Sequence, residues 1–337
     1  MALDERKKMI LKAVVDDYIS TAEPVGSKSL ALRNEFNISS ATIRNEMAEL
    51  EEDGYLIHPH TSAGRIPTDK GYRVYVDNLM QIPEPDEHYT RKVREFFREG
   101  LDEIADVLEN ASKVLAESTG YTSLTLTPRL RKSQLKQIKM LMIEPGKVLM
   151  VVVLEEGVVK DRLVRVSDII DESQLYRIAN AVESGLSGMP IEEITFIAVA
   201  AAGKKTEIPE SLLKQILYEA YVSIKQADRV GVYMDGSNNM LGYPEFFEIE
   251  KAKSFMDTLS ERGMVAGYLD EVSSDLGSGD GGSEGRRPYM IRIGQEITLA
   301  GMKDCSFVTT LYSTGRKIAG SIGVIGPRRM DYGKVVS

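Results

Sequence analysis

One stretch decides the fold of the N-terminal part of this chain: Ser39-Ser40-Ala41-Thr42-Ile43-Arg44-Asn45-Glu46-Met47-Ala48-Glu49-Leu50. Within it, the apolar residues Ile43, Met47 and Leu50 recur at helical spacing, and the leading serines are preferred residues for capping a helix start. Gly54 then follows as a natural helix end, because glycine readily adopts the left-handed conformation found there. The stretch therefore predicts a helix with one buried face and one polar face.

Two further helices are predicted before this stretch. Apolar residues recur at helical spacing from Leu3 to Ser20, and Pro24 and Gly26 interrupt the pattern. A short second helix is expected from Ser27 to about Glu35, and residues 37–40 form the turn into the third. Three short helices with such a turn between the second and the third indicate a helix-turn-helix unit.

The residues after Gly54 predict a two-stranded hairpin, or wing. Tyr55-Leu56-Ile57 alternates like a strand, residues 58–64 are rich in turn formers, and Arg65-Ile66-Pro67 reads as the returning strand. A further helix is expected from Thr68 onward. The first 80 residues are thus predicted to be a winged helix-turn-helix head.

A head of this kind places its third helix in the major groove of DNA, where residues on the first turns reach base edges. Arginine can bind guanine and asparagine can bind adenine with two hydrogen bonds each, and small wing residues let backbone amides approach phosphates. We therefore expect DNA contacts from Lys28, Ser39, Ser40, Thr42, Arg44 and Asn45 in the helix-turn-helix, from His58, His60, Thr61, Ser62 and Arg65 in the wing, and from Lys70 and Arg73 beyond it. The alternative is that the polar residues of the third helix are only its solvated face.

The charge of the chain opposes this interpretation. The net charge is -9, and the first 80 residues carry ten basic and thirteen acidic side chains, whereas phosphate binding requires lysine and arginine. The distribution favours DNA binding, because Glu49, Glu51, Glu52 and Asp53 lie beyond the part of the helix that would enter the groove.

The length of 337 residues predicts two or three domains. Strand-like runs begin an antiparallel sheet at residues 137–166, and strands are expected again at 289–297, 305–312 and 317–325. Between them we expect helices at 171–185, 208–226 and 248–262, strands at 194–201 and 229–234, and a flexible loop at 273–285. The sheet begun at residue 137 is expected to resume after residue 289, which makes the helical block between them an insertion.

The expected fold class is α+β with several domains. We expect the head at residues 1–80, a linker at 81–88, and the first part of the sheet domain at 89–166, which includes a long helix at 89–118. An inserted α+β domain is expected at 167–245, and the second part of the sheet domain at 246–337. The start of the chain lacks a secretory signal, and its longest apolar runs are too short to span a membrane. We therefore expect a cytoplasmic protein. The single cysteine, Cys305, and three histidines offer little for metal, cofactor or catalytic chemistry, so we expect no metal, no cofactor and no enzymatic activity.

Several motifs resemble the HrcA family of heat-inducible transcription repressors of bacteria. They are the residues 39–47, Leu50-Glu51, Gly54-Tyr55-Leu56, 58–69 and Gly71-Tyr72-Arg73 near the start, and Asp304-Cys305-Ser306, 320–327 and 329–332 near the end. The resemblance implies a winged-helix head, a GAF-like domain that contributes to dimerisation, and a second domain inserted into it. It also implies that a homodimer binds an inverted-repeat operator called CIRCE ahead of chaperone operons, and that the chaperonin keeps the repressor active.

Two other functions compete with this interpretation. In the first, the GAF-like domain binds a small molecule that controls DNA binding by the head, although no residue in the sequence indicates which ligand this is. In the second, Cys305 beside Asp304 is a nucleophile, which is disfavoured because the last 249 residues contain no histidine to activate it.

Overall fold

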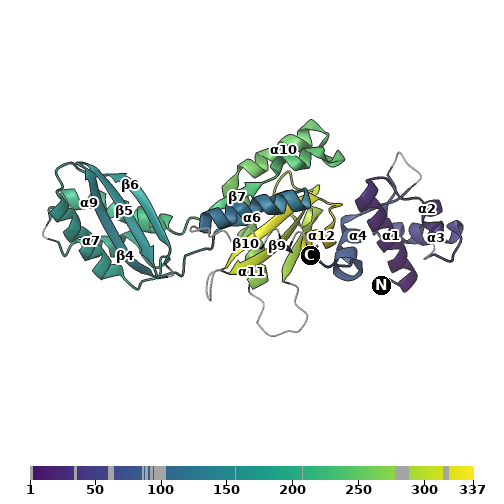
Figure 1. Ribbon diagram of the computed structural model, residues 1–337, viewed down its shortest axis with the longest axis horizontal. Coiled ribbons are helices and arrows are strands. Elements are labelled where there is room, and N and C mark those ends of the chain that lie inside the picture. The colour runs from purple at the N-terminus through teal and green to yellow at the C-terminus, as the bar shows by residue number, and fades with distance from the viewer. Residues whose placement is uncertain are drawn as a thin grey trace. The chain divides into compact units, whose positions relative to one another are not determined.

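The computed structural model describes residues 3–33, 36–59, 64–85, 87, 90–91, 94, 104–155, 157–206, 208–277, 288–313 and 319–337 (Figure 1). The chain forms two compact units, of which the first comprises residues 1–127, 232–314 and 319–337 and the second comprises residues 128–231. We call residues 3–80 of the first unit the head, the remainder of that unit the body, and residues 128–231 the insert.

The head contains the helices and strands that its sequence predicts. They are α1 (Glu5–Thr21), α2 (Ser27–Ala31), α3 (Ser40–Glu52), β1 (Leu56–Ile57), β2 (Ile66–Pro67), α4 (Asp69–Val74) and the π-helical turn η1 (Tyr75–Leu79). Ser39 caps α3, because its side chain accepts a hydrogen bond from the Thr42 N–H. Ile43, Met47 and Leu50 are buried, and Gly54 has a φ of 78° just beyond the end of α3.

The wing strands β1 and β2 pair in antiparallel register, Leu56 with Pro67 and Ile57 with Ile66. The backbones of Val25 and Arg65 also exchange two hydrogen bonds of 2.9 Å, which fasten the base of the wing to the segment after α1. Gly71 of α4 lies so close to the backbone of Tyr55 that an added Cβ would stand 2.2 Å from its carbonyl oxygen. Only glycine fits there, so this contact fixes α4 against the start of the wing.

The body is built on a five-stranded antiparallel sheet in the order β7-β3-β10-β9-β8. Its strands are β3 (Thr122–Leu126), β7 (Val232–Asp235), β8 (Tyr289–Ile293), β9 (Cys305–Ser313) and β10 (Ala319–Pro327). Its helices are α6 (Ile104–Thr119), α10 (Ile249–Ser260), α11 (Arg262–Gly277), α12 (Tyr332–Val336) and the 3-10 turns η2 (Ser237–Gly242), η3 (Pro244–Phe246) and η4 (Gly294–Glu296).

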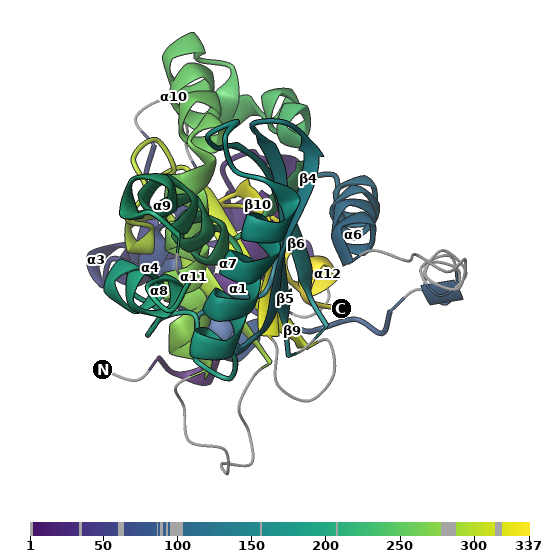
Figure 2. The same ribbon diagram turned by 90° about the vertical axis from the view of Figure 1, so that its left-hand side faces the viewer.

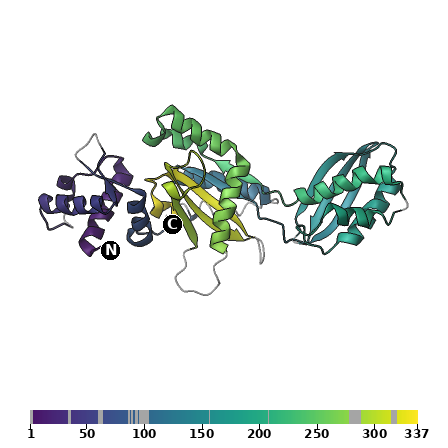
Figure 3. The same cartoon turned by 180° about the vertical axis from the view of Figure 1, so that it is seen from behind.

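Helices cover both faces of the body sheet. On one face, Ser112 of α6 lies 2.9 Å from the hydroxyl of Thr125 in β3. On the other face, Tyr268 of α11 packs edge-on against Phe307 of β9. Figure 1 shows α6 in front of the sheet, and Figure 3, from behind, shows α11 in front of it.

The insert has a sheet of its own, in the order β4-β5-β6. Its elements are β4 (Leu135–Glu144), β5 (Lys147–Leu154), β6 (Val159–Arg165), α7 (Glu172–Leu186), α8 (Phe196–Gly203) and α9 (Glu210–Gln226). Figure 2 shows the three helices together on one side of the three strands. Alternate residues of β5, such as Val148, Met150 and Val152, are fully or almost fully buried within the core that these helices complete.

Two predictions for this part of the chain are wrong. The strands at 135–165 do not begin the sheet that continues after residue 289, because they pair only with one another among the described residues, and the separate unit starts at Pro128 rather than at residue 167. Alternation in a strand shows which face is buried but does not identify the neighbouring strand. In addition, residues 196–203 form the helix α8 and not a strand, as four alanines and a glycine-ended run suit a helix better than a sheet.

Two further predictions are confirmed only in part: the loop at 273–285 and the long helix at 89–118. Residues 273–277 belong to α11, and residues 278–285 lie outside the described residues. The described helix α6 begins at Ile104 and ends one residue beyond the predicted end, and most of residues 89–103 lie outside the described part.

Candidate nucleic-acid interface

The start of α3 presents two exposed polar side chains, Arg44 and Asn45. Arg44 and Asn45 lie within the first two turns of α3 and are exposed. Neither makes a side-chain hydrogen bond or an ion pair with any residue that the structure describes. Ile43 and Met47 fix their orientation, because these two residues bury the opposite face of the helix.

The other predicted contacts of the helix-turn-helix surround this pair. Ser39 is exposed, and Ser40 and Thr42 are half-buried in the first turn, where the Ser39 and Thr42 hydroxyls lie 3.0 Å apart. Lys28 of α2 is exposed and makes no side-chain hydrogen bond or ion pair with a described residue. These side chains lie on the N-terminal part of α3 and on the neighbouring α2.

Three of the four acidic side chains of α3 are paired within the head. Glu46 lies 3.3 Å from Arg6, Glu49 lies 2.7 Å from Lys7, and Glu51 lies 2.8 Å from Arg65. The hydrogen bond to Glu49 raises the pKa of Lys7. Each of these carboxylates therefore has a cation beside it, which weakens its field near the start of α3 while the net charge of the head stays the same. Nothing in the sequence signals that residues of α1 would neutralise α3.

The structure describes only some of the predicted wing contacts. His58 is exposed, whereas His60, Thr61 and Ser62 lie outside the described residues. Arg65 is half-buried, and its guanidinium donates to Glu51 at the base of the wing. Lys70 is exposed but donates to the Asp53 carbonyl oxygen at 2.7 Å, and its ammonium lies 4.2 Å from the centre of the Tyr55 ring.

Arg73 does not lie with the other predicted contacts. Its guanidinium donates to Glu296 at 2.9 Å and to the carbonyl oxygen of Ile291 at 2.7 Å, both of which belong to the body. One turn earlier, the Asp69 carboxylate accepts a hydrogen bond from Arg328 at 3.0 Å and one from the Gln295 N–H at 3.0 Å. The helix α4 is thus tied to the body by two ion pairs, which sequence reasoning missed because the partners are more than 200 residues apart.

The described residues contain no group of three or more histidine, cysteine, aspartate or glutamate side chains placed to hold a metal ion. Within the same residues, no helix is both long enough and apolar enough to cross a membrane. Cys305 is buried, and burial raises the pKa of its thiol. A buried thiol with a raised pKa is a poor nucleophile.

An exposed arginine and asparagine on the first turns of a helix are the arrangement that a DNA-binding transcription regulator needs. The chain is 41% identical to the heat-inducible transcription repressor HrcA of Ruminiclostridium cellulolyticum, over 100% of this chain and 94% of that protein. It is 38% identical to the repressor of the same name from Acetivibrio thermocellus, over 100% of this chain and 93% of that protein. Residues 105–336 match the family described as HrcA protein C terminal domain. The chain belongs to the HrcA family of heat-inducible transcription repressors.

Membership of this family makes the chain a transcriptional repressor and not an enzyme, in agreement with the prediction from the sequence. A solved structure supports the fold. The crystal structure of a hypothetical protein has a TM-score of 0.56 and 21% identity, over 99% of this chain and 94% of that chain.

Proposed function

We propose that this chain represses heat-shock chaperone operons by binding an inverted-repeat operator of the CIRCE type as a homodimer. In this proposal the head is a winged-helix domain, and α3 enters the major groove. The observation that carries it is the pair Arg44 and Asn45, which are exposed at the start of α3 without partners among the described residues. Arginine and asparagine are suited to guanine and adenine respectively.

The remaining contacts follow from the placement of the other side chains. Ser39, Ser40, Thr42 and Lys28 suit the phosphates that flank the groove, since hydroxyls and ammonium groups commonly bind phosphate oxygens. We propose that His58, His60, Thr61, Ser62 and Arg65 place the wing on the adjacent backbone or minor groove. Lys70 remains a proposed phosphate contact, whereas Arg73 is better explained as a tie between head and body.

The homodimer is supported by an apolar row on the open face of the insert sheet. Leu141 and Leu163 are 51% and 59% exposed, and both are paired in register with Leu149 between them. Ile143, two residues from Leu141 on β4, is also exposed, as is Val159 further along β6. Contiguous exposed apolar residues mark interaction surfaces. A second copy of the chain is the occupant we propose, because an inverted-repeat operator requires a reader with two-fold symmetry.

The GAF-like character of the body and the action of the chaperonin are also proposals. The body has an antiparallel sheet with helices on both faces, as a GAF-like domain requires. The proposal that the chaperonin keeps the repressor active follows from the family resemblance. The chaperonin would raise the fraction of the chain that is able to bind the operator.

The test is a titration of the full chain against a fluorescent duplex carrying the inverted repeat, beside a scrambled duplex, at two salt concentrations. We expect two chains per operator and a preference for the repeat. Arg44→Ala should lose about 1–3 kcal/mol per half-site. Arg177→Ala is the matched control, because Arg177 is also an exposed helical arginine but lies in the insert.

Two arms of this titration separate the parts of the proposal. Equal, weak binding to both duplexes would refute sequence-specific repression through α3. Binding of one chain per operator with full affinity would refute the homodimer only. Adding the chaperonin should raise the active fraction without changing which duplex is preferred.

A further inference from the structure

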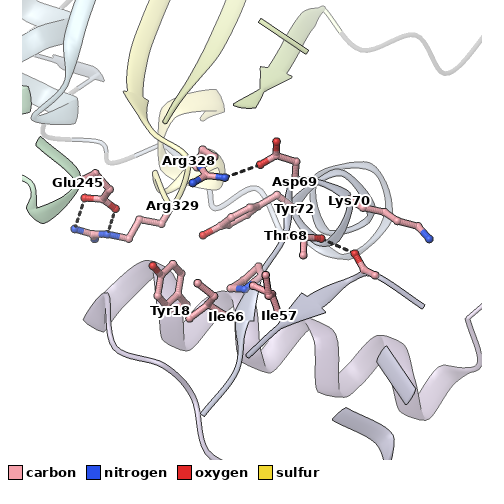
Figure 4. Close-up of a pocket in the computed structure, with 12 residues that line it drawn as sticks. Tyr18, Ile57, Ile66, Thr68, Asp69, Lys70, Tyr72, Glu245, Arg328 and Arg329 are labelled. Carbon is pink, nitrogen blue, oxygen red and sulfur yellow. Dashed lines mark hydrogen bonds and ion pairs between the residues drawn. The ribbon is translucent and has the colours of Figure 1, made fainter. Parts of the chain in front are cut away.

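A pocket of about 500 Å³ lies where the head meets the body (Figure 4). Tyr18, Ile57, Ile66 and Tyr72 line it from the head, and Arg328 and Arg329 line it from the body. All belong to the first compact unit. The volume falls within the range of about 300–1,000 Å³ typical of small-molecule sites.

Tyr72 contributes a buried polar atom that lacks a partner. Its side chain is 2% exposed, and its hydroxyl makes no hydrogen bond with any described residue. Figure 4 shows this hydroxyl and that of Tyr18 pointing toward the same space beside Arg329. A buried, unbonded hydroxyl is rare in folded proteins, because it forfeits the hydrogen bonds that water would give it.

The charged groups around Tyr72 are already neutralised. Arg328 bonds the carboxylates of Asp69 and Asp304, at 3.0 and 2.9 Å. Arg329 bonds Glu245 at 2.6 Å. A charged ligand beside Tyr72 would have to disrupt one of these pairs. Lys70 also lines the pocket, but Figure 4 shows its ammonium directed away from Tyr72, so the lining beside Tyr72 favours an uncharged ligand.

The rest of the lining indicates the shape and polarity of that ligand. Ile57, Ile66 and Pro67 form an apolar wall, which suits a ring or a short hydrocarbon. The Tyr72 hydroxyl is a donor that an acceptor oxygen would satisfy. Because this hydroxyl is buried, the ligand oxygen reaches it only after a neighbouring side chain of the lining moves aside. The requirement is therefore for an apolar body with a carbonyl or ether oxygen at one end.

We propose that this pocket binds a small uncharged organic molecule, with its apolar part against Ile57 and Ile66 and its oxygen accepting a hydrogen bond from Tyr72. The site is distinct from α3 and from any cavity inside the body sheet. A ligand there contacts the wing, α4 and the segment after β10 together. It therefore stabilises the arrangement in which head and body are in contact.

The experiment uses the full chain, without DNA, and acetophenone as the probe. Ethylbenzene is the control ligand, because it has the same ring but no oxygen, and benzoate is the charged control. Binding is followed by saturation-transfer NMR. We expect saturable binding of acetophenone, with ethylbenzene and benzoate each bound several-fold more weakly.

Three variants identify the site. Tyr72→Phe keeps the ring and removes the hydroxyl, so acetophenone should bind about fivefold more weakly while ethylbenzene is unaffected. Ile57→Trp, at a 51% exposed position on the rim, should fill the mouth and weaken both ligands. Tyr176→Phe removes a 66% exposed hydroxyl of the insert and should change neither.

Several results would overturn the proposal. These are the absence of saturable acetophenone binding, equal affinity in the wild type and Tyr72→Phe, or tighter binding of benzoate than of acetophenone. Melting of each variant beforehand confirms that it is folded. None of these outcomes bears on operator binding, which the assay does not include.

Discussion

The ion pair between Arg73 and Glu296 allows a test of whether Arg73 contacts DNA or ties the head to the body. Arg73 was predicted to contact DNA, yet its guanidinium bonds a carboxylate of the body with both Nε and Nη2. The Arg73 side chain is 30% exposed and the Glu296 side chain 33% exposed. The pair is therefore less screened by solvent than most surface pairs and has two-point geometry.

The coupling energy of the pair can be bounded. Fully exposed pairs contribute about 0.2–1 kcal/mol, whereas hydrogen bonds to charged groups contribute about 1.5–3 kcal/mol. We expect about 1.5 kcal/mol for the Arg73 and Glu296 pair, which is roughly a tenfold change in the constant for local opening. The free energy of the hydrogen bonds that Arg73 donates to other acceptors cancels in a double-mutant cycle, which leaves the coupling energy of the pair.

The assay is hydrogen exchange of the α4 amides in Arg73→Ala, Glu296→Ala and the double variant. Lys251 and Glu248 form the control pair, since their side chains are 43% and 69% exposed and meet at a single contact of 3.1 Å. The control cycle should give less than about 0.5 kcal/mol. A coupling as small as this for Arg73 and Glu296 would refute the contribution of this pair to the tie between head and body.

Operator affinity then distinguishes the two roles. If Arg73 is a tie, Arg73→Ala and Glu296→Ala should change affinity in the same direction and leave its salt dependence alone. If Arg73 contacts a phosphate, only Arg73→Ala should weaken binding, and it should lower the salt slope by about 1.

Three further predictions concern stability. Cys305 is the single cysteine and is 0% exposed, so it should react with a thiol reagent only after the body unfolds, and rapid labelling of the folded chain would contradict its burial. Burial raises the pKa of Tyr121 to about 12; its stabilising contribution should be complete below pH of about 10 and be lost as the pH rises to about 12, by roughly 3 kcal/mol. Absorbance of tyrosinate together with circular dichroism checks this, and a flat stability profile over that window would contradict it. Gly71→Ala should destabilise the head by roughly 3 kcal/mol, because its Cβ would meet the Tyr55 carbonyl oxygen at 2.2 Å, whereas Gly26→Ala, with open space at the same point, should change thermal melting little.

The sequence predicted those features whose causes are local. The helix α3 and the wing follow from apolar spacing, a serine cap and turn residues within a few positions of one another. The exposure of Arg44 follows in the same way from its place outside the buried row of Ile43, Met47 and Leu50. Such local patterns can be recognised in the sequence without knowledge of the rest of the fold.

Features that depend on distant partners could not be predicted in this way. The strands β4 to β6 alternate as a sheet, but only the folded chain shows that they do not join β8 to β10. Arg73 has the residue type of a DNA contact, and the groups of the body that it bonds lie more than 200 positions away. The pocket at Tyr72 is likewise assembled from both ends of the chain.

The acidic head illustrates why a summed charge is a poor guide to DNA binding. The sum does not show where the charges lie, and Glu46, Glu49 and Glu51 each have a basic partner within 3.3 Å. Pairing leaves the field near α3 to be set by its unpaired residues, because close opposite charges cancel at distances larger than their separation. Among the described residues of α3, Arg44 is the cation without a partner, and it stands on the turn proposed to enter the groove. A head that is acidic in total can therefore present a positive point to the DNA, and the low net charge limits binding to unrelated sequences.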